Sequence, residues 1–328
     1  MTPRPDVMQW RQELVDACRF GEEARAGVLV TQLGARKAKP LLEEMLTHPD
    51  ALVRQAAAFG LGVLGGAASA RRLEQQLAIE EARGDTDGES VVEAIIQALG
   101  HITESGARTT LVRRLARLVT RKPDPGDVSE LAHALWRRRH PDLIPSVRHN
   151  LERLGPPASR PLHGLLMLLE KSPEELRQWA LDPSIPVVHK TGVLTVLEEE
   201  LPESLVSALP SFISVAHSLS GAAARQQGEA SYYCDRLLIL LLLHEERVLP
   251  ALPSESRAEL RDLARTLVAA TALNCSLRAA SLLKFVGQPE DADIIEAHRP
   301  TEPVLAKVFD DASRALRNHA SSGERGTP

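Results

Sequence analysis

The sequence predicts an all-α protein built from repeated helical hairpins, and two patterns in its 328 residues carry that prediction. First, apolar side chains recur at three- and four-residue steps, as in "VRQAAAFGLGVLGG" at 53–66, and no segment alternates with a period of two for long enough to form a strand. Second, "VVEAIIQALGHITESGARTTL" from Val91 repeats "VRQAAAFGLGVLGGAASARRL" from Val53 at an offset of about 38 residues. Such a period indicates hairpins that bury their apolar faces against one another.

Turn and N-cap signals separate the helical periods along the whole chain. Examples are "HPDA" at 48–51, "KPDPGD" at 122–127 and "DPSIP" at 182–186. The polar stretches 81–90 and 218–231 are expected to be flexible loops, and 321–328 a disordered tail. The expected helix pairs are eight hairpins and a terminal pair, near 6–34, 37–65, 68–103, 106–139, 142–170, 173–200, 203–245, 254–287 and 289–319.

Composition and local sequence limit the function classes. A formal net charge of −5 argues against general nucleic-acid binding. The longest apolar run, "LLILLLL" at 237–243, is too short to span a bilayer and predicts a buried helix. The amino terminus lacks the apolar run of a signal peptide, and Cys18, Cys234 and Cys275 lack the spacing of a metal or disulfide motif. We therefore expect a cytoplasmic protein with core thiols and no membrane insertion.

The order of features within each period resembles the HEAT repeat, in the variety called PBS-lyase HEAT-like. These features are a Pro-Asp turn, Val-Arg, an Ala-rich helix, Leu-Gly and Pro-Leu-Leu, clearest at 22–111 and degenerate at 201–270. The resemblance implies one domain over 1–320, a right-handed α-α superhelix of about eight helical hairpins whose second helices line the concave side. The small residues of "AAAFGLG" then form the close contact between successive hairpins.

The resemblance implies binding more often than catalysis, because its enzymatic branches need residues that this chain supplies only in part. HEAT-like di-iron hydroxylases use several His-Glu pairs, whereas this chain has His244-Glu245, where helix capping is the simpler interpretation. HEAT-like alkyl-base DNA glycosylases resemble "LRQWALDPSIPVVHK" at 176–190, which offers Trp179 and Asp182 but lacks a second aromatic before His189. Asp182 is then expected to be the N-cap of the next helix.

No other catalytic or cofactor motif stands out. The chain has no phosphate-binding loop or nucleophile elbow, and His133 and its neighbouring histidines lack the spacing of a helical metal site. Nothing points to a bilin pocket. We therefore expect no catalytic residue, metal or cofactor, and a non-enzymatic adaptor or scaffold that binds a protein partner. The alternative is a nucleic-acid-binding or glycosylase-like protein of the same fold.

A basic region gives the first candidate surface. Residues 108–153 hold eleven Arg or Lys against five Asp or Glu, while the rest of the chain is acidic. Arg113, Arg117 and Arg121 follow one helical face by their i+4 steps. Either this face is merely solvated, or it docks an acidic segment of a protein partner. Nucleic acid is less favoured, because aromatic side chains for base stacking are missing.

A second candidate surface follows the internal repeat. The buried face of 53–66 is expected to leave Arg54 and Phe59 outside the core. The repeat offset places Gln97 and then His133 in the slot of Phe59. We expect these three side chains to form a concave row near Arg54 and Arg137 that binds a partner, with Phe59 as anchor. The alternative is that Phe59 packs under the loop expected at 81–90.

Overall fold

A computed structural model describes residues 7–121 and 123–323 of the chain, without the side chains of residues 121 and 319–323. The structure is 80% helical with 20 α-helices, and its described residues contain no strand. The fold is an all-α solenoid, as the sequence predicts. The chain divides into two compact units, unit 1 over residues 1–162 and unit 2 over residues 163–328.

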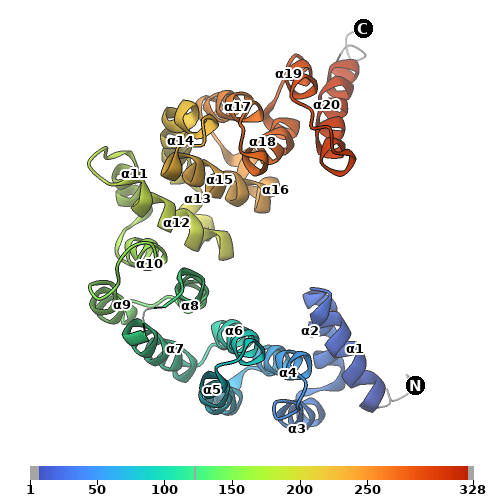
Figure 1. The fold of residues 1–328 in the computed structure, drawn as a ribbon, viewed down its shortest axis with the longest axis vertical. Helices are drawn as coiled ribbons and strands as arrows, with labels where there is room; N and C mark the ends of the chain where they lie inside the picture. Colours follow the sequence, from blue (N-terminus) through green and yellow to red (C-terminus); the bar gives the residue numbers. More distant parts are fainter. Residues whose placement is uncertain (1–6, 122, 324–328) are drawn as a thin grey trace. The chain divides into compact units, whose positions relative to one another are not determined.

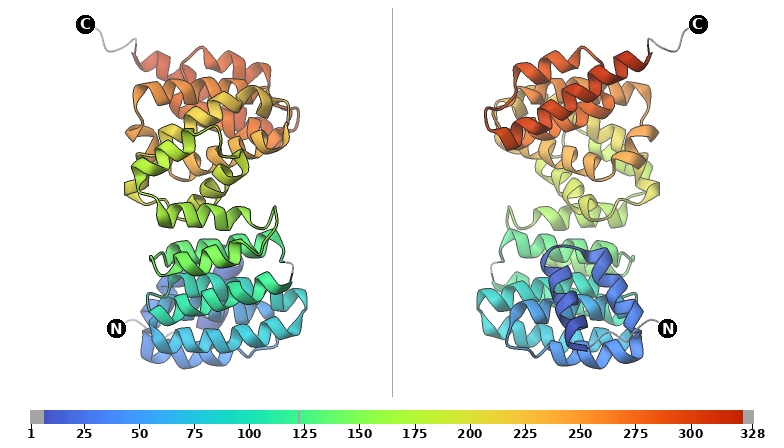
Figure 2. Two further views of the ribbon diagram at one scale, coloured as in Figure 1. Left: turned by 90° about the vertical axis from the view of Figure 1, so that its left-hand side faces the viewer. Right: turned by 90° about the vertical axis from the view of Figure 1, so that its right-hand side faces the viewer.

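Unit 1 consists of helical hairpins whose members are stacked in two layers (Figures 1 and 2). Its helices are Val7–Arg19 (α1), Glu23–Leu33 (α2), Ala35–Met45 (α3), Ala51–Leu64 (α4), Gly66–Arg83 (α5), Thr86–His101 (α6), Ser105–Leu118 (α7), Pro125–Arg137 (α8) and Leu143–Leu151 (α9), with a 3-10 turn at Val119–Arg121. The first helices α5, α7 and α9 pack side by side in the A layer. The second helices α2, α4, α6 and α8 pack side by side in the B layer.

Small residues bring the helices of the B layer close together. A Cβ atom added at Gly62 of α4 would lie 3.0 Å from the Ala98 Cα of α6. A Cβ atom added at Gly100 of α6 would lie 3.2 Å from the Ala134 Cα of α8. The same pair of small residues therefore recurs at two successive interfaces, where a larger side chain would force the helices apart. This is the role that the sequence predicts for the small residues of "AAAFGLG".

Aspartate caps begin three consecutive helices of this layer. The side chains of Asp50, Asp85 and Asp124 accept hydrogen bonds from backbone N–H groups in the first turns of α4, α6 and α8. Between α5 and α6 the turn is short, because Gly84 adopts a left-handed φ of 64° and Asp85 caps at once.

The flexible loops predicted at 81–90 and 218–231 are wrong, because helices occupy most of both stretches. Most of 81–90 is helical, since α5 continues to Arg83 and α6 begins at Thr86. In 218–231 only residues 225–227 lie outside helices. Polar side chains there mark exposed helical faces rather than irregular chain.

Unit 2 repeats the two-layer arrangement. Helix Arg160–Glu170 (α10) crosses the boundary between the units, and the helices after it are Pro173–Leu181 (α11), Val187–Glu199 (α12), Glu203–Val206 (α13), Leu209–Ala224 (α14), Gly228–Leu243 (α15), Glu245–Ala251 (α16), Ser254–Val268 (α17), Leu273–Val286 (α18), Asp291–Ala297 (α19) and Pro303–Gly323 (α20). Neighbours α11, α14, α17 and α19 form the A layer, and α12, α15, α18 and α20 form the B layer.

The helix pairs follow the predicted hairpins, with α13 and α16 as short additions around the hairpin of α14 and α15. The apolar run 237–243 lies in α15, and its leucines at 237, 238, 240 and 241 are fully buried, which confirms the predicted buried helix. Among the described residues, no helix is long and apolar enough to cross a membrane. A single domain over 1–320 stays a prediction, and residues 324–328 of the expected tail lie outside the described residues.

Candidate functional site

The predicted row of Phe59, Gln97 and His133 lies on α4, α6 and α8, three consecutive helices of the B layer in unit 1. Gln97 is exposed, whereas Phe59 and His133 are partly exposed. The Gln97 side chain reaches α8, where its Nε2 donates to the Glu130 Oε2 at 3.5 Å. The three residues of the predicted row therefore lie on helices that pack against one another in sequence order.

Other exposed or partly exposed side chains share this side of the three helices, and together they define the unit 1 B face. It consists of Leu52, Gln55, Phe59 and Val63 on α4, Glu93, Gln97 and His101 on α6, and Asp127, Glu130, His133 and Arg137 on α8. The α4 part is apolar apart from Gln55. The α6 and α8 parts carry all of the charge, so the face changes from apolar to charged across the layer.

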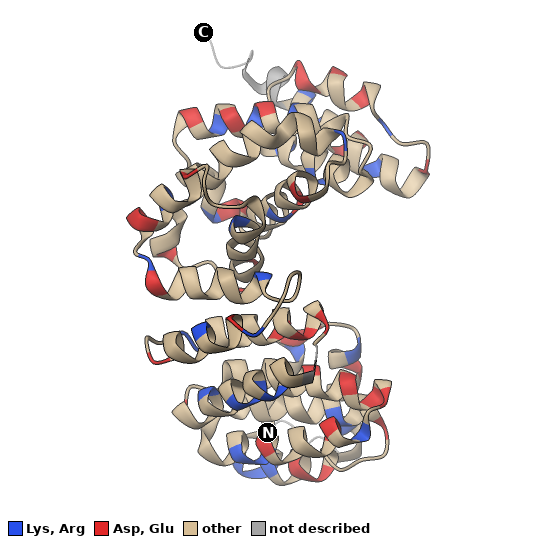
Figure 3. Cartoon of the chain, turned by 60° about the vertical axis from the view of Figure 1, so that its left-hand side comes forward, with Lys and Arg blue, Asp and Glu red and all other residues tan. Residues whose placement is uncertain are grey.

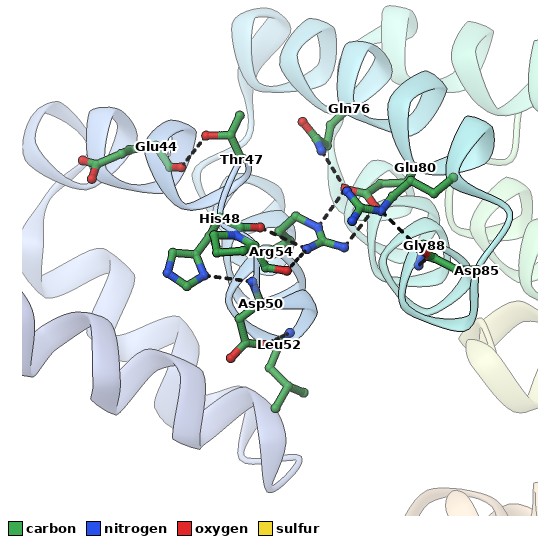
Figure 4. A network of polar contacts seen from close by, with 12 residues as sticks. Glu44, Thr47, His48, Asp50, Leu52, Arg54, Gln76, Glu80, Asp85 and Gly88 are labelled. Atoms are coloured by element: carbon green, nitrogen blue, oxygen red, sulfur yellow. Dashed lines mark hydrogen bonds and ion pairs between the residues drawn. The ribbon is translucent and has the colours of Figure 1, made fainter.

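Arg54 corrects the sequence prediction, because it is not on this face. It is 1% exposed and lies between α4 and α5 (Figure 4). Its Nε donates to the Glu80 Oε1 at 2.9 Å, and its Nη1 donates to the carbonyl oxygens of His48 at 3.0 Å and Pro49 at 2.8 Å. A buried guanidinium needs all of these acceptors to offset its lost hydration. Arg54 is a structural residue that ties α5 to the turn before α4.

The carboxylates of the unit 1 B face repel one another. Burial raises the pKa of Glu93 above its ordinary value, and the neighbouring charges of Glu130 and Asp127 on α8 raise it further. Within the described part of the chain, no Lys or Arg side chain forms an ion pair with any of these three residues. The start of the face therefore holds negative charge that no described Lys or Arg side chain neutralises.

The other end of the same face carries the Arg137 guanidinium beside the His101 imidazole. Burial lowers the pKa of His101, the Arg137 guanidinium beside it lowers it further, and Glu23 of α2 acts in the opposite direction. His101 lies eight residues after Glu93 on α6, which corresponds to about 12 Å along the helix axis. The face therefore carries grouped carboxylates at its start and the single guanidinium of Arg137, beside an imidazole with a lowered pKa, at its other end.

The basic region predicted from residues 108–153 has a different environment. Arg114 and Arg117 of α7 lie 3.1 and 3.3 Å from the Glu81 Oε1 of α5. Arg113 pairs with Glu74 of α5, and Arg108 lies 2.6 Å from Asp142. The Arg121 side chain lies outside the described residues.

In Figure 3, positions of Lys and Arg (blue) and of Asp and Glu (red) are interspersed on the helices of unit 1. Sequence counting missed the pairing because Glu74 and Glu81 precede the basic window. Most of the described arginines of α7 are therefore neutralised across the A layer.

The B layer of unit 2 also carries paired charges. Arg236 of α15 lies 3.1 Å from Glu198 of α12 and 3.6 Å from its own neighbour Asp235, which in turn pairs with Arg278 of α18. Burial raises the pKa of Glu198 to about 7 even though the Arg236 guanidinium favours its charged form. Opposite charges alternate across these three helices, in contrast to the unit 1 B face.

The glycosylase-like segment is occupied by structural contacts. Asp182 is the C-cap of α11, and the N-cap of α12 is Pro186 rather than the predicted Asp182. The Asp182 Oδ1 accepts from the Ser184 backbone N–H at 2.8 Å and from the Ser184 hydroxyl at 2.7 Å. These hydrogen bonds lower the pKa of Asp182. The buried Lys190 donates from Nζ to the Asp182 carbonyl at 2.8 Å, and the His189 ring stacks on His163 with centroids 4.1 Å apart. This arrangement forms a turn rather than a base pocket.

No described group of three or more His, Cys, Asp or Glu side chains is placed to hold a metal ion. Among known families, the HEAT repeat model matches residues 39–66, which span the second half of α3, all of α4 and the turn after it. A comparison with curated proteins gives no match.

Proposed function

Because the chain is a HEAT-repeat protein, we propose that it is a non-enzymatic adaptor that binds a protein partner on the unit 1 B face. HEAT-repeat solenoids are commonly protein-interaction scaffolds, since stacked hairpins expose long rows of helical side chains. The partly exposed Phe59 supplies an aromatic anchor, and Gln97 supplies polar contacts that fix the register of a bound segment. Free Cys18, Cys234 and Cys275 support a cytoplasmic location for this activity.

The observation that carries the proposal is the unneutralised group of Glu93, Asp127 and Glu130. Repulsion among these carboxylates lowers the stability of the protein alone, and such local conflicts are expected where a partner supplies the missing interaction. The acidic partner expected from the basic region has less support, because Arg113, Arg114 and Arg117 already pair with Glu74 and Glu81. The same pairing weakens the nucleic-acid alternative, which needs arginines available to phosphate.

A photo-cross-linking amino acid placed on each layer tests this proposal. Gln97 lies at the centre of the unit 1 B face, and Gln75 is another exposed glutamine, on α5 in the A layer. Cross-linking in native cells should capture a partner protein from position 97 and none from position 75. Capture from position 75 alone, or from neither position, would contradict binding on this face.

A further inference from the structure

We propose that the unit 1 B face binds an extended partner segment in which a Lys or Arg lies about four residues from an apolar side chain. This inference rests on the adaptor function proposed above and names the chemistry of the partner. It reverses the partner charge expected from the sequence, because the grouped charges without an ion pair on the unit 1 B face are the carboxylates of Glu93, Asp127 and Glu130.

The cation follows from the three carboxylates on α6 and α8. Helices α6 and α8 pack side by side, and Gln97, one turn after Glu93, reaches the Glu130 Oε2 at 3.5 Å, so Glu93 lies beside the start of α8 with Asp127 and Glu130. Their charges hinder its ionisation. A Lys or Arg side chain between the two helices would interact with all three carboxylates at once and remove that repulsion. An acidic segment at this position would add a further negative charge to the group.

The apolar side chain follows from α4. Leu52 and Val63 are each 37% exposed, and the partly exposed Phe59 lies between them on the same side of the helix. Gln55 is the remaining member of the α4 part of the face, so this part attracts no charged side chain. An apolar side chain that covers Phe59 gains burial without leaving a charge unpaired.

The spacing follows from the close packing of the layer. Gly62 against Ala98 and Gly100 against Ala134 keep neighbouring helices near the short end of the usual 8–10 Å axial separation. The distance from α4 to the space between α6 and α8 is then about 12–15 Å. An extended chain advances about 3.3 Å per residue, so about four residues separate the apolar side chain from the cation.

The other described charge clusters do not offer the same partner a comparable site. Arg113, Arg114 and Arg117 neutralise Glu74 and Glu81 across the A layer of unit 1. In unit 2, Asp291 is fully buried and lies 2.6 Å from Arg261 and 3.3 Å from Arg265. A basic segment would have to displace an existing guanidinium at either place, whereas at Glu93 it displaces none.

Selection from a random peptide library on the full-length chain tests the inference. The selected peptides should share a Lys or Arg and an apolar residue about four positions apart, and their affinity should fall as salt is raised. The double variant Glu93→Gln, Glu130→Gln should weaken binding of a fluorescent selected peptide at least tenfold. The matched control Glu152→Gln, Glu255→Gln removes the same charge from exposed positions outside the face and should leave binding unchanged.

The opposite outcomes separate the inference from the adaptor function. Suppose instead that acidic peptides are selected and that the double variant Arg113→Glu, Arg117→Glu weakens their binding. That result would contradict both the basic partner and its binding on the unit 1 B face, and the protein would be an adaptor that binds through α7. Basic peptides that bind equally to the double variant and the control would overturn the assignment to Glu93 and Glu130. Failure of both peptide selection and cross-linking from Gln97 would count against the adaptor function itself.

Discussion

The B layers of the two units place charged side chains on neighbouring helices with opposite results. In unit 2, Glu198 on α12, Asp235 and Arg236 on α15, and Arg278 on α18 alternate in sign and pair with one another. In unit 1, Glu93 on α6 faces Glu130 and Asp127 on α8. These charged side chains are thus paired with opposite charges in unit 2 and placed beside like charges in unit 1.

This difference points to where the molecule interacts. Paired charges across neighbouring helices satisfy each other and leave little to attract a partner. Like charges held side by side cost stability, and they persist where another molecule compensates them. The apolar side of α4 adds a place where a partner side chain could be buried next to the carboxylates. The comparison therefore favours the unit 1 B face over the corresponding surface of unit 2.

The largest expected effect comes from the buried pair that holds α4 in its orientation. Arg54→Ala removes the nearest guanidinium from the fully buried Glu80 carboxylate, which keeps only Gln76 at 2.7 Å and Arg83 at 3.6 Å. The variant should lower the free energy of unfolding by about 3–5 kcal/mol. Urea denaturation followed by circular dichroism measures this loss. The double variant Arg54→Met, Glu80→Leu should recover most of it, because no buried charge then remains. An Arg54→Ala variant of wild-type stability would show that the pair does not fix α4.

The pH dependence of unit 2 is the next test. The pKa of the folded-state Glu198 is about 7, above the ordinary value of 4.5, so the folded protein binds an extra proton between these values. Stability from this group is complete below about pH 4.5 and is lost as the pH rises through 7. In the wild type, the free energy of unfolding should fall as the pH rises from 4.5 to 7. In Glu198→Gln this fall should be smaller by roughly 1–3 kcal/mol. An unchanged pH profile would remove Glu198 as its source.

The anchor role of Phe59 predicts a loss of binding with little loss of stability. Phe59→Ala should weaken binding of a selected peptide by about 1–3 kcal/mol, because the ring supplies much of the buried area. Its melting temperature should change by only a few degrees, roughly 2–4 °C. The matched control is Phe285→Ala, which removes a 43% exposed ring from α18 in the B layer of unit 2 and should not affect binding. Early melting with normal binding by the folded fraction would show that Phe59 belongs to the core.

The smallest expected effect is a gain in stability. Glu93→Gln removes one of the repelling carboxylates and should raise the free energy of unfolding at pH 7 by about 0.2–0.5 kcal/mol. The sign follows from the raised pKa, since ionisation of Glu93 opposes folding once the pH exceeds its ordinary value. At a pH below that value the gain should vanish. A loss of stability at pH 7 would mean that Glu93 has a favourable partner.

The sequence predicted the architecture well because the repeat encodes local contacts. The equivalence of Gly62 and Gly100 identified the two positions where neighbouring helices pack most closely against small residues in the B layer of unit 1. Trp136 of α8 occupies the next equivalent position, so the glycine is not repeated there. Close packing of this kind depends on small residues that recur at the same position of each repeat. Aligning the sequence with itself detects that recurrence.

The candidate site was harder to predict because its properties depend on neighbours that are distant in sequence. Arg54 lies on the apparently polar side of α4, yet α5 covers that side and supplies Glu80. The basic character of α7 is cancelled by Glu74 and Glu81 of the preceding hairpin. The group of Glu93 and Glu130 forms only when α6 and α8 are placed side by side. A single-helix pattern contains none of this information.

Side-chain NMR titration tests the central claim most directly, by comparing how neighbours act on Glu93 and Glu198. Glu130→Gln should lower the pKa of Glu93, because it removes a like charge from the next helix. Arg236→Met should raise the pKa of Glu198, because it removes an opposite charge. Opposite shifts would establish that unit 1 leaves negative charge unmatched while unit 2 neutralises its own. A Glu93 pKa that is unchanged or raised in Glu130→Gln would contradict the account.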